Sequence, residues 1–118
     1  MEKTEAVAAL AALAQGSRLD VFRLLVQAGP EGMSAGQIGE RLGLPGATLS
    51  FHLNQLKQAG LVTFRREGRS LIYLAEFEAM NSLLAYLTEN CCQGDSAACG
   101  VPVCDSGQLK PKRRSARQ

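Results

Sequence analysis

The sequence predicts a mainly helical domain that carries one β-hairpin, which places it in the α+β class. Three observations support this prediction. Apolar residues recur at helical spacing in several stretches before residue 60, two β-prone runs follow between residues 61 and 74, and helical spacing returns from residue 76. The chain has 118 residues, 46% of them hydrophobic, which suffices for one modest core. We therefore expect four helices, a hairpin and a fifth helix.

The first two helices are expected on either side of a break at Gln15-Gly16. Residues 5–14 are rich in Ala and Leu, which have high helix propensity. Ser17, with Asp20 three residues later, is the expected cap of a second helix that ends at Ala28 before a glycine. The side chains expected to face inward from this helix are Leu19, Phe22, Leu25 and Val26.

The next two helices are predicted to form a helix-turn-helix. Ser34 and Gln37 have the spacing of a capping box, and Gly43 is placed to end the short helix that follows. Only Leu44-Pro45-Gly46 separates this helix from the next, which runs to Gly60. Two short helices joined by a tight turn containing Gly are typical of DNA-binding proteins in which the second helix enters the major groove.

The two faces of that second helix differ in chemistry. Leu49, Leu53 and Leu56 share one side, whereas the other side offers hydroxyls, amides and small side chains. Such groups are suited to hydrogen bonds with base edges and phosphates. The candidate DNA-contacting residues of this helix are Ala47, Thr48, Ser50, Phe51, His52 and Gln55.

Two of these candidates have alternative roles. Phe51 could meet a thymine methyl group or cover a partner helix, and neither role is preferred. His52 is the only histidine and lies toward the apolar side, so we favour packing and hydrogen bonding at the margin of the DNA over metal ligation.

A hairpin with a basic tip is predicted directly after this helix. Residues 61–66 and 70–74 are β-prone runs around Glu67-Gly68-Arg69. A hairpin in this place is the wing of a winged helix-turn-helix. Its candidate DNA contacts, to phosphates or a narrow minor groove, are Arg65, Arg66 and Arg69. The alternative is a solvated tip without contact to DNA.

Charge supports nucleic-acid binding only locally. The net charge is +2, but five basic residues lie in the last nine positions, and the rest of the chain has 8 basic and 11 acidic residues. Between residues 45 and 75, however, four basic residues stand against Glu67 alone. The basic tail, residues 107–118, is expected to be disordered and to add weak, unspecific attraction to DNA.

The last helix is predicted from residue 76 to about Asn90, with Met80, Leu83, Leu84 and Leu87 on one stripe. A small domain has little left for this stripe to cover. We therefore expect the first and last helices to form the two-fold interface of a homodimer. The sequence shows neither a membrane-spanning stretch nor a signal peptide, so a cytoplasmic location is expected.

Residues 14–74 resemble the ArsR/SmtB family of bacterial winged-helix repressors. The matching segments are residues 13–25, residues 48–62, the Arg-Glu-Gly-Arg run at 66–69 and Ile72-Tyr73. The resemblance implies a homodimer that binds palindromic operator DNA and leaves it when a metal or metalloid ion binds. Several arsenic sensors of the family carry a Cys-Val-Cys pair in the helix before the recognition helix, but residues 34–42 contain no cysteine here. With one histidine, the His/Asp/Glu-rich zinc sites of other members cannot be assembled either.

All four cysteines lie near the end of the chain. Cys91 and Cys92 are adjacent, and small residues after Gly94 let the chain fold back to bring Cys99 alongside. Three soft thiolates suit trivalent arsenic or antimony, which takes a pyramidal shell of three sulfurs, so arsenite is the expected inducer, with antimonite and organoarsenicals as alternatives. Some arsenite sensors of this family carry a similar Asn-Cys-Cys…Cys cluster after the last helix. The predicted ligands of the inducer are therefore Cys91, Cys92 and Cys99, with no role for Cys104 and no organic cofactor.

The expected organisation follows from these assignments. Residues 1–92 form the DNA-binding and dimerisation domain, residues 93–106 the cysteine-bearing inducer segment, and residues 107–118 the tail. Alternative roles of the cysteines are structural zinc, a redox switch, and zinc or cadmium sensing with Cys104 as a fourth ligand. A small thiol reductase is a further alternative, but the chain has no Cys-x-x-Cys motif or phosphate-binding loop, so no enzymatic activity is expected.

Overall fold

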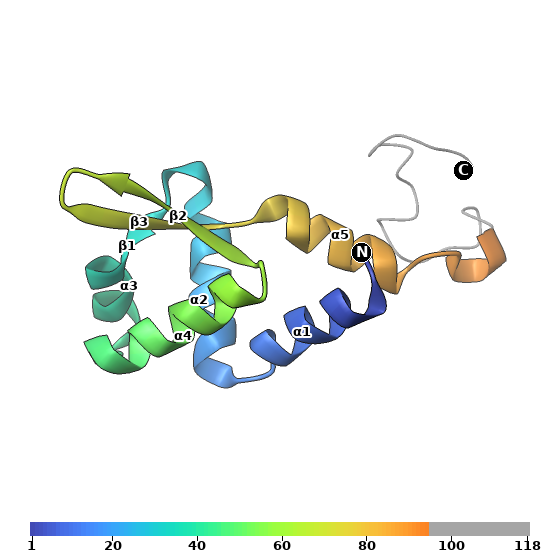
Figure 1. Cartoon of the computed structure of the whole chain (residues 1–118), viewed down its shortest axis with the longest axis horizontal. Helices are drawn as coiled ribbons and strands as arrows, with labels where there is room; N and C mark the ends of the chain where they lie inside the picture. The colour runs from blue at the N-terminus through green and yellow to red at the C-terminus, as the bar shows by residue number, and fades with distance from the viewer. Residues whose placement is uncertain (95–118) are drawn as a thin grey trace. The chain divides into compact units, whose positions relative to one another are not determined.

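The computed structural model describes residues 1–94, and its elements follow the predicted order (Figure 1). They are helices and strands with these bounds: α1 Lys3–Leu13, α2 Gly16–Ala28, the 3₁₀ helix η1 Gly29–Glu31, β1 Met33–Ser34, α3 Ala35–Leu42, α4 Gly46–Gln58, β2 Val62–Glu67, β3 Ser70–Ala75, α5 Phe77–Leu87 and the 3₁₀ helix η2 Cys91–Gly94. The predicted class, mainly helical with a β-hairpin, is confirmed. Residues 1–80 form one compact unit, and a second unit begins at residue 81.

The core of the first unit lies where α2, α3 and α4 pack together. Leu25, Ile38 and Leu56 are 0% exposed, and each contributes about 1.5 to 3 kcal/mol by leaving water. Leu19 was predicted to face inward, but it is 43% exposed, and Val21 is buried instead. The reason is helical phase: the buried stripe of α2 is centred between Val21 and Leu25, and Leu19 lies more than a quarter turn away from it.

Capping residues set the beginnings of the helices. The capping box of α3 is confirmed, since the Ser34 side chain accepts from the Gln37 backbone and the Gln37 side chain accepts from the Ser34 backbone N–H. The predicted cap of α2 is wrong. Gln15 is the N-cap, and its side-chain oxygen accepts a hydrogen bond from the Arg18 backbone N–H at 2.9 Å. Because Gln15 occupies the capping position, the helix begins at Gly16, and Ser17 lies inside it.

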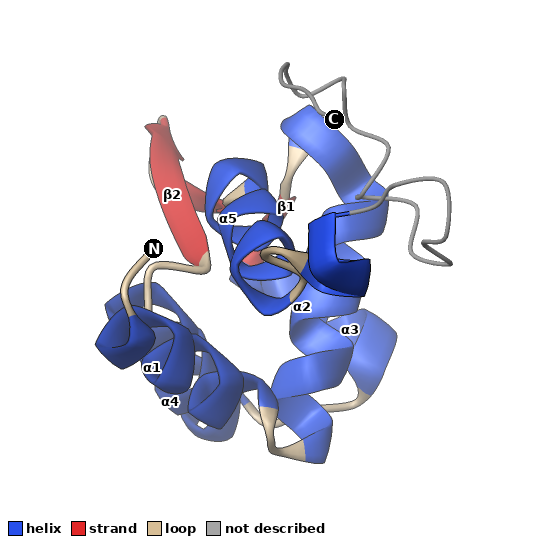
Figure 2. Ribbon diagram, turned by 90° about the vertical axis from the view of Figure 1, so that its right-hand side faces the viewer, coloured by secondary structure: helices blue, strands red, loops and turns tan. Residues whose placement is uncertain are grey.

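The sheet has three strands in the order β1-β3-β2, all antiparallel. Strands are coloured red in Figure 2. The predicted hairpin is confirmed, and Glu67 pairs with Ser70 around a two-residue turn. Strand β1 was not predicted, because two residues are too short for a period-two pattern. Gly32 precedes it with φ 67°, and a Cβ there would lie 2.5 Å from the Tyr73 carbonyl oxygen. Only glycine lets the chain approach β3 this closely.

The described part of the second unit, residues 81–94, contains the end of α5 and η2. Helix α5 ends at Leu87, before the predicted end at Asn90. After it, the Cys91 backbone N–H donates to the Thr88 carbonyl at 2.9 Å, which closes a turn directly before η2. Among the described residues, no helix has both the length and the apolar character needed to cross a membrane.

Candidate nucleic-acid interface

The turn between α3 and α4 is tight because the two helices approach closely. The Leu44 backbone N–H donates to the Gly39 carbonyl at 3.1 Å, closing the end of α3. A Cβ on Gly39 would lie 3.2 Å from the Leu44 carbonyl oxygen, closer than most side chains are found. Pro45 is the N-cap of α4 and provides no side-chain hydrogen bond. The first turn of α4 therefore presents its backbone N–H groups without a side-chain cap, next to the candidate contact residues.

The two faces of α4 separate as predicted. Leu49, Leu53 and Leu56 are at most 2% exposed, whereas Phe51 is 55% exposed. The other exposed candidates are Ala47, Thr48 and Ser50, and Gln55 is half-buried. Within residues 1–94, the side chains of Thr48, Ser50 and Gln55 make no hydrogen bond, so their polar groups are available to an external partner.

His52 does not belong to the exposed face. It is 7% exposed and is the only buried polar side chain among the described residues. Its Nδ1 lies 3.4 Å from the guanidinium of Arg18 on α2, and its ring contacts the edge of Phe51. His52 therefore packs inside the fold, which agrees with the packing and hydrogen-bonding role favoured for it, and its place in the DNA-contacting set stays a prediction.

The arginines of the wing fall into two groups. The Arg65 guanidinium donates to Glu67 at 2.6 Å and to the backbone carbonyls of Pro30 and Glu31 at 3.1 and 3.0 Å. Arg65 therefore fastens the hairpin to η1, and its assignment as a phosphate contact stays a prediction. Arg66 and Arg69 are exposed, and neither side chain forms an ion pair or hydrogen bond with another described residue. These two positive charges are available to an external partner.

An additional contact joins the recognition helix to the wing. The Lys57 ammonium of α4 lies 4.8 Å from the centre of the Phe64 ring on β2, a cation–π contact. Phe64 in turn packs on Tyr73 of β3, its cross-strand partner, with 5.9 Å between ring centres. The sequence pattern did not reveal this contact, because its three residues come from separate elements.

The structure describes only part of the predicted inducer site. Cys91 is half-buried and Cys92 is exposed in η2, and Cys91 takes part in a disulfide bond. Asn90 and Cys92 have positive φ angles of 59° and 55°, so the backbone turns sharply at the cysteine pair. Residues 1–94 contain no group of three or more His, Cys, Asp or Glu side chains placed to hold a metal ion. Cys99 and Cys104 lie outside the described residues.

Comparison with known proteins supports the interpretation of this surface. Residues 13–64 match a family model described as a helix-turn-helix domain. The HTH-type transcriptional regulator YgaV of Escherichia coli is 31% identical over 88 residues, which cover 75% of this chain and 87% of YgaV.

Two solved structures are also similar. An ArsR-like transcriptional regulator from Rhodococcus sp. RHA1 superposes with a TM-score of 0.68 at 26% identity, over 80% of this chain and 87% of that one. The second is the homodimeric winged helix-turn-helix DNA-binding domain of Mb0332 from Mycobacterium bovis, named as a possible ArsR-family regulator. It has a TM-score of 0.60 at 29% identity, over 72% of this chain and 77% of that one. With its winged helix-turn-helix and exposed recognition face, the chain belongs to the ArsR family of DNA-binding transcriptional regulators, which are not enzymes.

Proposed function

We propose that this regulator is a homodimeric repressor that holds a palindromic operator and is released when trivalent arsenic binds Cys91, Cys92 and Cys99. The observation that carries the proposal is the adjacent pair Cys91-Cys92 in η2, at the sharp turn that follows α5. Vicinal thiols supply two of the three soft sulfur ligands of trivalent arsenic from one place in the chain. Cys99, seven residues further along the sequence, is the proposed third.

Apolar exposure on α1 and α5 supports the dimer. On α1, Val7 is 58% and Leu10 is 43% exposed, and they lie on adjacent positions around the helix. On α5, Leu84 is 41% and Leu87 is 55% exposed. Large apolar side chains that gather on exposed helix faces mark protein interfaces. A second copy of the chain is the proposed occupant, in line with the homodimeric domain from Mycobacterium bovis.

DNA release follows from where the cysteines lie. Cys91 and Cys92 follow the helix assigned to the dimer interface, so joining them to Cys99 reorders the chain beyond α5 and shifts that interface. The two recognition helices then lose the spacing that a palindromic operator requires. A tenfold loss of DNA affinity needs only about 1.4 kcal/mol of preference for the DNA-incompetent dimer. By linkage, operator DNA should weaken arsenite binding by the same factor.

Fluorescence anisotropy with operator DNA from the regulator's own promoter tests this proposal under reducing conditions. Arsenite should dissociate the wild-type complex. Cys91→Ser, Cys92→Ser and Cys99→Ser should each bind DNA normally and fail to respond, and Cys104→Ser should respond like the wild type. If Cys99→Ser responds and Cys104→Ser does not, the third ligand is misassigned. If arsenite also dissociates DNA from a variant that lacks all four thiols, the inducer site is not made of cysteine.

A redox-sensing repressor is the second candidate, and one observation favours it: Cys91 takes part in a disulfide. An oxidised Cys91 cannot donate a thiolate to arsenic, so the two functions exclude each other in one molecule at one time. Peroxide treatment in the absence of arsenite distinguishes them. Redox sensing predicts that peroxide alone releases DNA and that dithiothreitol restores binding, whereas the arsenic sensor needs the reduced protein and the ion.

A further inference from the structure

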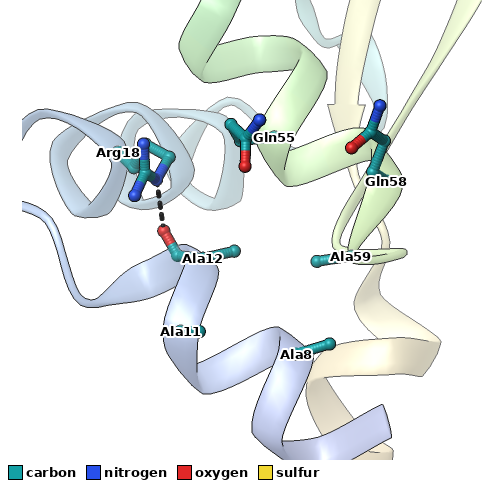
Figure 3. Close-up of a pocket in the computed structure, with 7 residues that line it drawn as sticks. All are labelled: Ala8, Ala11, Ala12, Arg18, Gln55, Gln58 and Ala59. Carbon is teal, nitrogen blue, oxygen red and sulfur yellow. Dashed lines mark hydrogen bonds between the residues drawn. The ribbon is translucent and has the colours of Figure 1, made fainter.

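A groove of about 440 Å³ lies between α1 and α4 in the first unit, and none of its lining residues is a cysteine (Figure 3). Its apolar walls are alanine side chains: Ala8, Ala11 and Ala12 of α1, and Ala59 at the end of α4. Alanine side chains are small, so they do not fill the space between the two helices, and the groove stays open. Its polar wall consists of Arg18, Gln55 and Gln58.

Arg18 gives the groove its charge. Its Nε donates to the Ala12 carbonyl at 2.7 Å, and one Nη lies 3.4 Å from His52 Nδ1. These two contacts hold the guanidinium in place, and a guanidinium has five N–H donors, so several remain for another partner. Arg18 forms no ion pair with any carboxylate among residues 1–94, and the groove lining contains no acidic residue. A half-buried positive charge without a counter-ion is a site for an anion.

We propose that this groove binds a small organic acid whose carboxylate is held by Arg18 and whose flat, apolar body lies against the alanines. The volume falls in the range of small-molecule sites, about 300 to 1,000 Å³. The guanidinium fork matches a carboxylate in geometry and charge. The side-chain amides of Gln55 and Gln58 can donate to a second polar group of the ligand.

Ligand binding in the groove is coupled to DNA binding through α4. Gln55 lines the groove and also belongs to the candidate base-contacting residues of the recognition helix. A ligand hydrogen-bonded to Gln55 competes with a base for the same amide. The groove therefore makes the regulator responsive to a small molecule, independently of its cysteines.

Benzoate is the probe for this site, since it combines a carboxylate with a flat ring, and benzamide is its uncharged control. The measurement is NMR of full-length protein labelled with ¹³C at the alanine methyl groups. Benzoate should shift the signals of Ala8, Ala11 and Ala59 and leave Ala75, which lies in β3, unchanged. Benzamide should shift them at least about tenfold less at equal concentration, because it lacks the charge-assisted bond. Equal shifts from the two probes would overturn the proposal.

Variants locate the binding. Ala8→Leu fills the groove from an exposed position and keeps every contact of Arg18, so it should abolish binding without unfolding the protein. Ala14→Leu, at an exposed position outside the groove, is its control. Arg18→Gln should weaken benzoate binding about tenfold or more, whereas Arg23→Gln, exposed on the same helix, should not. Unchanged affinity in both Ala8→Leu and Arg18→Gln would show that benzoate binds elsewhere.

Two further measurements separate the groove from other uses of the same surface. Because α1 is also assigned to the dimer interface, benzoate is titrated at low and at high protein concentration; loss of the benzoate-induced shifts where the dimer forms would show that a second copy fills the groove, against the proposal. A variant with Cys91, Cys92 and Cys99 changed to Ser should still bind benzoate, since no cysteine belongs to the groove lining. Loss of binding in that variant would overturn the assignment to the groove, whatever the outcome for arsenite.

Discussion

The recognition helix and the wing both present polar side chains to solvent, but they differ in how many of these side chains are already occupied. On α4, the hydroxyls of Thr48 and Ser50 have no partner within the described chain. On the wing, Arg65 is exposed and charged, yet its guanidinium is already bonded to Glu67 and to two carbonyls of η1. Exposure and charge alone therefore do not show that a side chain is available to DNA. We expect the contacts to come from the groups that have no partner within residues 1–94.

The largest effect is expected from truncating a side chain on the buried face of α4. Leu56→Ala should reduce the free energy of unfolding by about 2 to 5 kcal/mol, because Leu56 is 0% exposed and its truncation leaves a cavity. Phe51→Ala on the opposite face should change it by less than about 0.5 kcal/mol. Urea denaturation measures both. A similar loss in the two variants would mean that Phe51 is covered in the native assembly.

Base recognition should depend on the helix and not on the wing. Ser50→Ala should weaken operator binding by about 1 to 3 kcal/mol if its hydroxyl contacts a base, and binding to random-sequence DNA should change much less. Ser70→Ala, an exposed hydroxyl at the start of β3, is the matched control. Anisotropy titrations with both DNAs decide the matter. Equal losses on the two sequences would show that Ser50 contacts only the backbone.

The unpaired wing arginines should act through salt-dependent attraction. Replacing Arg66 and Arg69 with Gln should lower affinity for every DNA sequence. The slope of log affinity against log salt should fall by about 0.9 for each phosphate that the variant no longer neutralises. Titrations at several salt concentrations give this slope. An unchanged slope would show that the tip of the wing stays in solvent when DNA is bound.

The smallest effect is expected at Arg65, and it should be of a different kind. Arg65→Gln should leave the salt slope unchanged and lower stability by about 1 kcal/mol, because it removes exposed hydrogen bonds to η1. Arg65→Lys should not restore the loss, since an ammonium cannot bond both carbonyls and Glu67 with the same fork. If Arg65→Gln lowers the salt slope as much as one of the tip arginines, Arg65 leaves η1 when DNA binds.

The elements that the sequence predicted well are those whose signals lie within a few residues. The capping box of Ser34 and Gln37, the glycine end of α3 and the apolar face of α4 were all confirmed, because each depends on local spacing. The cap at Gln15 was missed, since glutamine is an uncommon N-cap and Ser17 offered a stronger local signal.

The features that could not be predicted depend on distant partners. Arg65 meets carbonyls more than thirty positions away, and Arg18 meets His52 at the same kind of separation. No periodicity within one segment reports such contacts. The groove between α1 and α4 is likewise a property of two helices together, and neither the alanines of α1 nor Gln55 revealed it alone. The arsenic ligands remain a prediction, since Cys99 lies outside the described residues.

The contact of Lys57 with Phe64 has a consequence for how this protein distinguishes DNA sequences. It links the end of the recognition helix to β2 of the hairpin, so we expect it to help hold the two elements in one relative position when they meet a duplex. The protein then sets the distance between the base edges that α4 is expected to contact and the phosphates that the wing is expected to contact. Sequences whose helical repeat or groove width does not match that separation must deform to be bound, and the cost of deforming them discriminates between sites at base pairs that no side chain touches.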